Sequence, residues 1–109
     1  MRDLRYGIEI EMTGLSRGKA AETLAGFFGT RAEHTGGSYD AYAVRDAQDR
    51  VWKLVSDGSI QTQKKVRGQT VAADSTYSVE LVSPVCVYED IETIQEIVRA
   101  LRRNNALVN

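Results

Sequence analysis

Apolar and polar residues alternate near the start of the chain. Across residues 6–12, four side chains (Tyr6, Ile8, Ile10 and Met12) fall on one side and Gly7, Glu9 and Glu11 on the other. This period of two is typical of a half-buried β-strand. Similar β-prone runs predict strands at residues 39–44, 51–55 and 77–82, the last of them closed by Ser83-Pro84.

Two segments repeat their apolar residues with helical spacing instead. The first is capped by Ser16, carries Ala20, Leu24, Phe27 and Phe28 on one face, and ends at Gly29. The second carries Ile91, Ile94, Val98 and Leu101 on one face and stops at Asn104-Asn105. Its acidic start and basic end match the helix macrodipole through Glu89, Asp90, Glu92, Arg99, Arg102 and Arg103.

The segments between these elements are polar. Residues 31–37 are predicted to form a loop, residues 46–50 a polar turn, and residues 61–75 an exposed loop or a mobile hairpin. Asp57-Gly58 is a turn signal, and residues 106–109 resemble the start of another strand. The order β-α-β-β-β-α predicts an α+β fold, with an antiparallel sheet and two helices packed on one of its faces.

Composition narrows the class of protein. The 109 residues have room for one domain, and 42% hydrophobic with 27% charged residues is typical of a soluble globular chain. Fourteen Lys and Arg against fifteen Asp and Glu argue against a non-specific nucleic-acid binder, which would be basic. With no long apolar run, a polar N-terminus and the single cysteine Cys86, we expect a cytoplasmic protein without a membrane segment.

Three carboxylates are the strongest candidates for chemistry. Glu9 and Glu11 lie two residues apart on a predicted strand, so their side chains share a face and repel unless a cation lies between them. Glu80 interrupts another β-prone run. If the three converge, they suit a divalent ion such as Mg²⁺ or Mn²⁺. The alternative is a solvated outer face, with Glu80 paired to a Lys or Arg across the sheet.

Several other residues have two interpretations each. Asp57-Gly58-Ser59 fits an active-site turn or an ordinary hairpin turn, and Arg17 fits an anion contact or a surface arginine. The basic residues Lys64, Lys65 and Arg67 fit phosphate binding or a solvated loop. One histidine, His34, and one cysteine cannot build a typical zinc site. Cys86 is expected to be a buried thiol, and Trp52 to lie in the core.

Three motifs in order carry a resemblance to a known family. They are Tyr6-Gly7-Ile8-Glu9-Ile10-Glu11-Met12-Thr13-Gly14, Val55-Ser56-Asp57-Gly58-Ser59-Ile60 and Val79-Glu80-Leu81-Val82-Ser83-Pro84, followed by a helix from Tyr88 to Arg102. Over essentially its whole length the chain resembles the putative amidoligase family, which is related to glutamine synthetase and the carboxylate-amine ligases.

The resemblance implies a chemistry and a set of roles. In that superfamily ATP phosphorylates a carboxylate, an amine attacks the acyl phosphate to give an amide, and divalent metals bridge the phosphates. It implies Glu9, Glu11 and Glu80 as metal ligands, Asp57 and Ser59 as residues that handle the amine or substrate, and Arg17 as a catalytic contact to phosphate or carboxylate. The implied cofactors are ATP and Mg²⁺ or Mn²⁺, and the substrates a carboxylate and an amine, either peptides or amino acids.

One departure from the family leaves other interpretations open. Family members continue past the second helix into a His-x-His strand, whereas this chain stops at Leu107-Val108-Asn109. It therefore resembles the N-terminal part of an amidoligase domain, whose site a homodimer or another chain would complete. The alternatives are a non-catalytic assembly module that associates through an open sheet edge, and a nucleic-acid-binding module that uses Lys64, Lys65, Arg67, Arg102 and Arg103.

Overall fold

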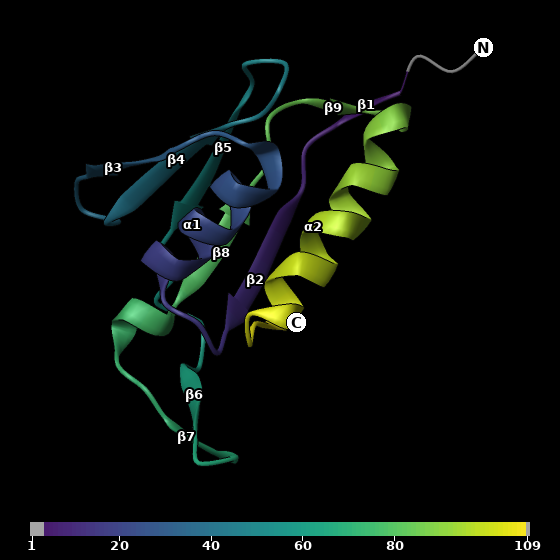
Figure 1. Ribbon diagram of the computed structural model, residues 1–109. Helices are drawn as coiled ribbons and strands as arrows, with labels where there is room; N and C mark the ends of the chain where they lie inside the picture. The colour runs from purple at the N-terminus through teal and green to yellow at the C-terminus, as the bar shows by residue number, and fades with distance from the viewer. Residues whose placement is uncertain (1–3, 109) are drawn as a thin grey trace.

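The computed structural model of the protein describes residues 4–108 (Figure 1). Two α-helices, α1 (Arg17–Phe28) and α2 (Ile91–Arg103), accompany short 3₁₀ turns at Ser75–Tyr77 and Tyr88–Asp90. The strands are β1 (Arg5–Tyr6), β2 (Glu9–Thr13), β3 (Ala32–Gly36), β4 (Ala41–Arg45), β5 (Val51–Val55), β6 (Gln63–Val66), β7 (Gln69–Ala72), β8 (Val79–Val82), β9 (Cys86–Val87) and β10 (Leu107–Val108). Their mixture is that of an α+β fold, as predicted.

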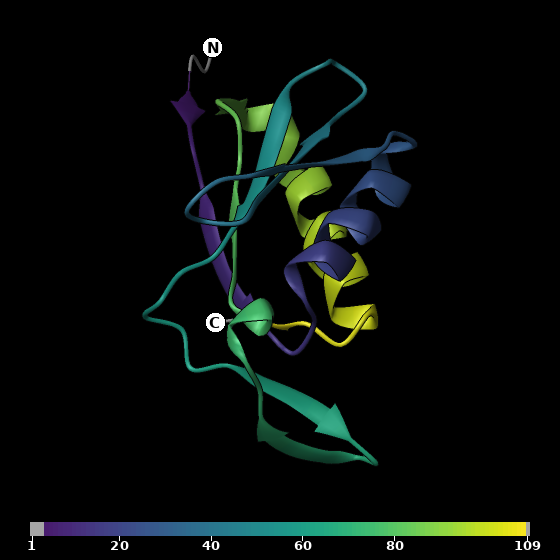
Figure 2. The ribbon, with the colours of Figure 1, turned by 90° about the vertical axis from the view of Figure 1, so that its left-hand side faces the viewer.

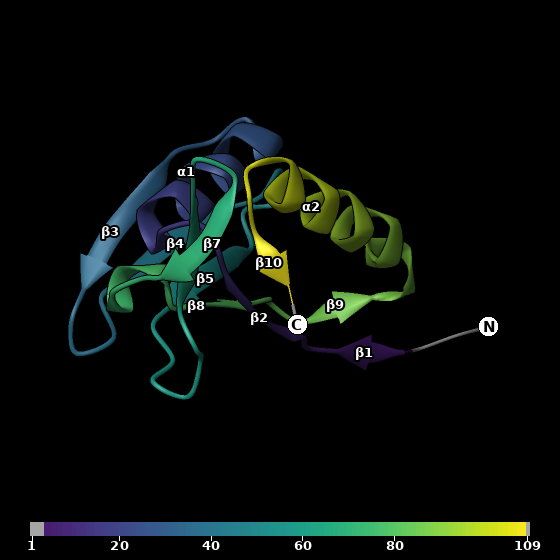
Figure 3. The same cartoon turned by 90° about the horizontal axis from the view of Figure 1, so that it is seen from below.

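A six-stranded antiparallel sheet forms the body of the protein, in the order β10-β2-β8-β5-β4-β3. Both helices lie on one face of this sheet, as the views from the side and from below show (Figures 2 and 3). No described helix covers the opposite face. The β6–β7 hairpin is a separate two-stranded ribbon that projects from one end of the body.

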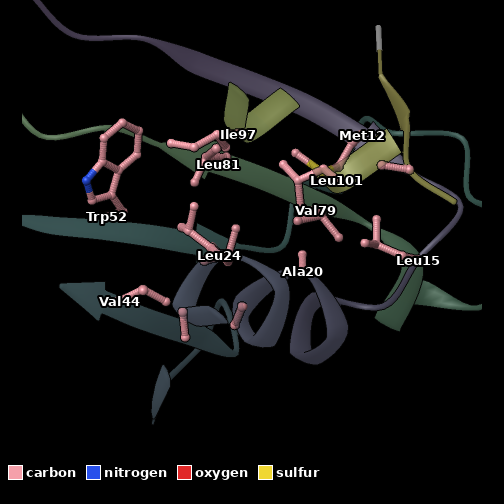
Figure 4. Close-up of a cluster of buried hydrophobic side chains, with 14 of the residues drawn as sticks. Met12, Leu15, Ala20, Leu24, Val44, Trp52, Val79, Leu81, Ile97 and Leu101 are labelled. Atoms are coloured by element: carbon pink, nitrogen blue, oxygen red, sulfur yellow. The ribbon is translucent and has the colours of Figure 1, made fainter. Parts of the chain in front are cut away.

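The core lies between the sheet and the helices. Alternate residues of the central strands, such as Met12, Leu54 and Leu81, are fully buried there. Figure 4 shows Met12 and Leu81 in one cluster with Leu24 of α1 and Leu101 of α2. Trp52 is also fully buried, as predicted, and its ring packs 5.5 Å from that of Phe28. The thiol of Cys86 is buried as well.

The start and end of α1 follow local chemistry, whereas the buried faces of both helices differ in part from the prediction. The Ser16 side chain accepts a hydrogen bond from the Lys19 amide, and Gly29 ends α1 in the left-handed conformation at φ 72°. Phe27, predicted to be on the inner face, is 39% exposed, whereas Ala21 and Ala25 are buried. In α2, Ile91, predicted to share one apolar face with Ile94, Val98 and Leu101, is exposed.

The packing of α2 against α1 and the sheet explains that difference. Ile97 and Leu101 are 1% exposed, whereas Ile91 opens the helix and is 40% exposed. Ile94 and Val98 flank the contact and are half-buried. The apolar period was therefore correct for a helix, but the centre of the buried stripe is displaced toward Ile97.

Two segments depart from the sequence-based expectation, and two others agree with it. The predicted loop at residues 31–37 contains the edge strand β3, which pairs only with β4 and whose polar composition suits an exposed edge. The predicted strand at residues 6–12 is broken at Gly7-Ile8, opposite Ser83-Pro84, because proline has no amide hydrogen for the ladder. Residues 61–75 contain the exposed β6–β7 hairpin, one of the two expected alternatives. The predicted strand start at residues 106–109 corresponds to β10, although Asn109 lies outside the described residues.

Candidate functional site

Two glutamates face each other across the centre of the sheet. In the antiparallel pairing of β2 with β8, Glu11 is directly opposite Glu80, while the neighbouring pair Ile10 and Leu81 points into the core. Because cross-strand partners share a face, both carboxylates project from the side of the sheet that the helices leave bare. Two of the three glutamates proposed to converge, Glu11 and Glu80, therefore lie together.

The third member of the cluster is Asp57, two residues beyond the end of β5. Carboxylate oxygens of Glu11, Asp57 and Glu80 all lie within 4.8 Å of one another, and the three residues are partly buried. The resemblance had implied Glu9 here and a substrate role for Asp57. Glu9 pairs with Val82, is more exposed, and lies one step further along the same face, outside the group of three.

A hydrogen-bonded turn sets the position of Asp57. Its Oδ1 accepts hydrogen bonds from the Ser59 amide at 2.9 Å and the Ser59 hydroxyl at 2.7 Å. Its own amide donates to Ser78 Oγ at 2.8 Å, and that hydroxyl donates to the Asp57 carbonyl at 2.6 Å. The turn lies in the long connection between β5 and β6, which do not pair with each other, so the hairpin-turn interpretation is wrong.

The three carboxyl groups differ in acidity. The hydrogen bonds from Ser59 lower the pKa of Asp57, so this group stays ionised. The pKa of Glu11 is raised, first because its protonated form can donate to Asp57, and then by burial and nearby negative charge. Burial, followed by the charges of Glu9, Asp57 and Glu11, raises the pKa of Glu80. The cluster therefore pairs one carboxyl group whose pKa is lowered with two whose pKa values are raised.

This donor set fits a hard divalent cation. Mg²⁺ and Mn²⁺ prefer carboxylate oxygens and are commonly held by a few protein ligands, with water or phosphate completing the shell. A cation among Glu11, Asp57 and Glu80 would relieve the repulsion that otherwise favours protonation of the two glutamates.

Ser59 and Arg17, the other two predicted site residues, are both engaged within the protein. The hydroxyl of Ser59 donates to Asp57, as described above. Arg17 begins α1 and is only 5% exposed, so its interpretation as a surface arginine is wrong. Its guanidinium donates to the Asp40 carboxylate and to the backbone carbonyls of Ser75 and Ser78.

Two residues that support this cluster, Ser78 and Asp40, were not predicted from the sequence. Ser78 is 3% exposed and forms hydrogen bonds with Asp57, which lies 21 positions earlier in the sequence. The Asp40 carboxylate forms an ion pair with Arg17 at 2.8 Å and lies 2.6 Å from Nε2 of His34. Both are small polar residues at the edges of strands, a pattern shared by ordinary turns, so only the folded arrangement identifies them.

Comparisons with known proteins give one positive finding. The family described as putative amidoligase enzyme matches residues 2–109. No match to the chain was found among the curated proteins, and none among the solved structures. Within residues 4–108, no helix combines the length and the apolar character that a membrane crossing requires.

Proposed function

The chain belongs to the putative amidoligase enzyme family, and from this premise we propose that it is the catalytic domain, or part of it, of an ATP-dependent carboxylate-amine ligase. In such a reaction the terminal phosphoryl group of ATP passes to a substrate carboxylate, ADP leaves, and an amine displaces phosphate to form the amide. This is the glutamine synthetase type of reaction that the family resemblance of the motifs implies.

The carboxylate cluster is the observation that carries this proposal. Glu11, Asp57 and Glu80 come from three separate segments, yet their oxygens lie within 4.8 Å on the bare face of the sheet. These residues would hold Mg²⁺ or Mn²⁺, which when bound neutralises phosphate charge during phosphoryl transfer. Phosphoryl transfer depends mainly on positioning and charge neutralisation, the two properties that a rigid strand pair with clustered carboxylates supplies.

The three carboxyl groups of the cluster have different roles because their pKa values are shifted in different directions. Asp57, kept ionised by Ser59, supplies a permanent negative charge at the cluster. The raised pKa values of Glu11 and Glu80 reflect burial and crowded negative charge, and a bound cation would lower both by favouring the ionised carboxylates. Glu9 lies next along the face and is proposed as a more distant ligand. Ser59 is proposed to act through Asp57, because its hydroxyl is already committed there.

Titration with Mn²⁺ tests the proposal directly. We expect the protein to bind Mn²⁺, with ATP strengthening the binding, and Glu11→Gln to weaken it by about tenfold or more because a charged ligand is lost. Glu9→Gln should have a smaller effect. Calorimetry or electron paramagnetic resonance of free Mn²⁺ measures both.

Glu33→Gln is the matched control. Glu33 lies opposite Ala43, which is opposite Lys53, so it projects from the same bare face at the far edge of the sheet. The substitution Glu33→Gln removes one negative charge from the same face of the sheet, as Glu11→Gln does, but leaves the carboxylate cluster intact. Equal binding by Glu11→Gln and the unmodified protein, or equal weakening by both variants, would refute the proposed site.

A further inference from the structure

A buried cation lies behind the carboxylate cluster. Arg17 is 5% exposed, and burying an arginine is costly unless its nitrogens are fully paired. Its Nη1 donates to the Ser75 carbonyl at 2.8 Å and to the Ser78 carbonyl at 2.7 Å. Its Nη2 and Nε donate to Asp40 Oδ2 at 2.8 and 3.3 Å. All three nitrogens are therefore used inside the protein.

Two hydrogen-bonded routes lead from Arg17 to the Asp57 turn. On the first, Arg17 holds the Ser78 carbonyl, and the Ser78 hydroxyl exchanges two hydrogen bonds with the backbone of Asp57. On the second, Arg17 holds both the carboxylate and the carbonyl of Asp40, and the preceding carbonyl of Tyr39 accepts from the Ser56 amide at 3.0 Å. The two routes meet at consecutive residues, Ser56 and Asp57.

The same contact also sets the start of β8. Ser78 immediately precedes this strand, and Glu80 is its second residue. Fixing the Ser78 carbonyl therefore fixes the strand end from which Glu80 projects. One guanidinium thus restrains two of the three carboxylates, which come from segments more than 20 residues apart in sequence.

We propose that Arg17 is a positioning residue, which through Ser78 and Asp40 holds Asp57 and Glu80 at the separation that binds a divalent cation. The effect on cation binding rests on the proposed function, whereas the positioning of Asp57 and Glu80 by Arg17 does not. The positioning role replaces the direct phosphate or carboxylate contact that the resemblance implies for Arg17, because a guanidinium paired in this way is not presented to a substrate.

Arg50 provides a matched control. Its guanidinium is also partly buried and makes three charged contacts of 2.9 Å, one to Asp46 and two to Asp90. It precedes β5, whereas Asp57 follows the other end of that strand, which places the two about 17 Å apart or more. Arg50→Lys therefore disturbs a comparable ion-pair network without a bonded route to the cluster.

The experiment compares Arg17→Lys, Ser78→Ala and Arg50→Lys at a temperature well below the unfolding transition of each. In the metal-free protein, hydrogen exchange of the Asp57 amide should quicken by about tenfold in the first two variants only, because the hydrogen bond to Ser78 is weakened or lost. Mn²⁺ affinity should fall by about tenfold in the same two variants, the effect expected for loss of a residue that orients ligands. Ser78→Thr, which keeps the hydroxyl, should restore both.

Each outcome separates the inference from the proposed function. If Asp57 exchange is unchanged in Arg17→Lys, or changes equally in Arg50→Lys, Arg17 does not position the turn and the inference is wrong. If Arg17→Lys fails to fold, Asp40→Asn decides in its place, since it weakens the contacts of Arg17 to Asp40 and leaves Ser78 intact; unchanged Asp57 exchange in that variant overturns the inference. If exchange responds as expected but the unmodified protein binds no Mn²⁺, the positioning role stands and the proposed function fails.

Discussion

At the scale of single residues, the cluster is a place where the folded protein tolerates unfavourable charge. Glu80 is opposite Glu11 and close to Asp57, and like charges directly opposite on a sheet reduce stability. Burial and these neighbours raise the pKa of Glu80 above its ordinary value of 4.5. Ionisation of Glu80 therefore opposes folding when no cation is present.

Glu80→Gln should stabilise the metal-free protein at pH values above 4.5, the ordinary pKa of the glutamate side chain. A group whose pKa is raised by folding favours the folded state below its ordinary pKa, and this contribution is lost as the pH rises. We expect the variant to be more stable than the unmodified protein by about 0.5 kcal/mol at pH 7 to 8, and the two to converge near pH 4. Urea denaturation at several pH values, with a chelator present, measures this. A Glu80→Gln variant that is less stable at pH 7 would contradict it.

The sequence predicted part of this cluster and could not predict the rest. Alternation along β2 places Glu9 and Glu11 on one face, but it does not say which residue of another strand lies opposite either. The register that aligns Glu11 with Glu80 joins residues 69 positions apart. Asp57 enters the cluster through a turn whose position depends on Ser78, so its role as a neighbour of the two glutamates followed only from the fold.

At the scale of elements, two turns meet where both helices join the sheet. Gly14, in the turn between β2 and α1, has φ +93°, and its amide donates to the Gln63 carbonyl at 2.9 Å. A Cβ atom at this position would lie 2.3 Å from the carbonyl oxygen of Asn105, in the turn between α2 and β10. Only glycine allows this approach without displacement of one turn.

Gly14→Ala should therefore destabilise the protein by about 2 kcal/mol, from the backbone conformation and the overlap together. Gly26→Ala is the control, because Gly26 lies within α1 with open space around its Cα. This second change should instead stabilise the protein by about 0.5 kcal/mol, since alanine favours the helix. Chemical denaturation measures both. Loss of similar size in the two variants would show that the contact with Asn105 is unimportant.

The elements themselves were predictable in proportion to their local signals. Ser16 and Gly29 bound α1 as expected, because capping depends on neighbouring residues alone. The edge strand β3 was missed because its exposed, polar sequence Ala-Glu-His-Thr-Gly lacks the apolar alternation of a central strand. It is a strand because β4 lies beside it, and pairing of this kind is not a property of the segment by itself.

At the scale of the whole molecule, an ion-pair network joins distant parts of the chain. The Arg50 guanidinium pairs with both oxygens of Asp90 and with Asp46, whose carboxylate also accepts from the indole of Trp52 at 3.0 Å. Asp90 Oδ2 additionally accepts from the Val87 amide. The turn between β4 and β5 is thereby tied to the start of α2, 40 residues later in the chain.

Asp90→Asn should reveal this tie through its pH dependence. The Arg50 hydrogen bonds lower the pKa of Asp90 below 3.8, so its stabilising effect is complete above that pH and is lost as the pH falls through the lowered value. We expect the variant to lose about 2 kcal/mol at pH 7, and the difference to shrink below pH 3.8. Urea denaturation between pH 7 and pH 3 measures it, with Glu96→Gln, an exposed partner of Arg99, as the control expected to cost less than about 0.5 kcal/mol. If the stability lost by Asp90→Asn were the same at every pH, the negative charge of Asp90 would not be its cause.

The overall plan of the fold was predicted more successfully than its connectivity. Alternating strands and two amphipathic helices indicated an antiparallel sheet covered on one side, and the six-stranded sheet agrees. The short pairs β1–β9 and β6–β7 lie outside it. In the strand order β10-β2-β8-β5-β4-β3, the strand that comes first along the chain, β2, pairs with the one that comes last, β10. Sequence patterns state which residues are buried in each element, but not which element lies next to it.

The bare face of the sheet has a consequence for how this protein can change through evolution. On β2, the residues that support the core (Ile10 and Met12) alternate with the residues that face outward (Glu9 and Glu11). Substitutions on the outer set leave the packing of the inner set intact. New specificities can therefore arise at neighbouring positions of the same strand while the fold beneath them is inherited unchanged.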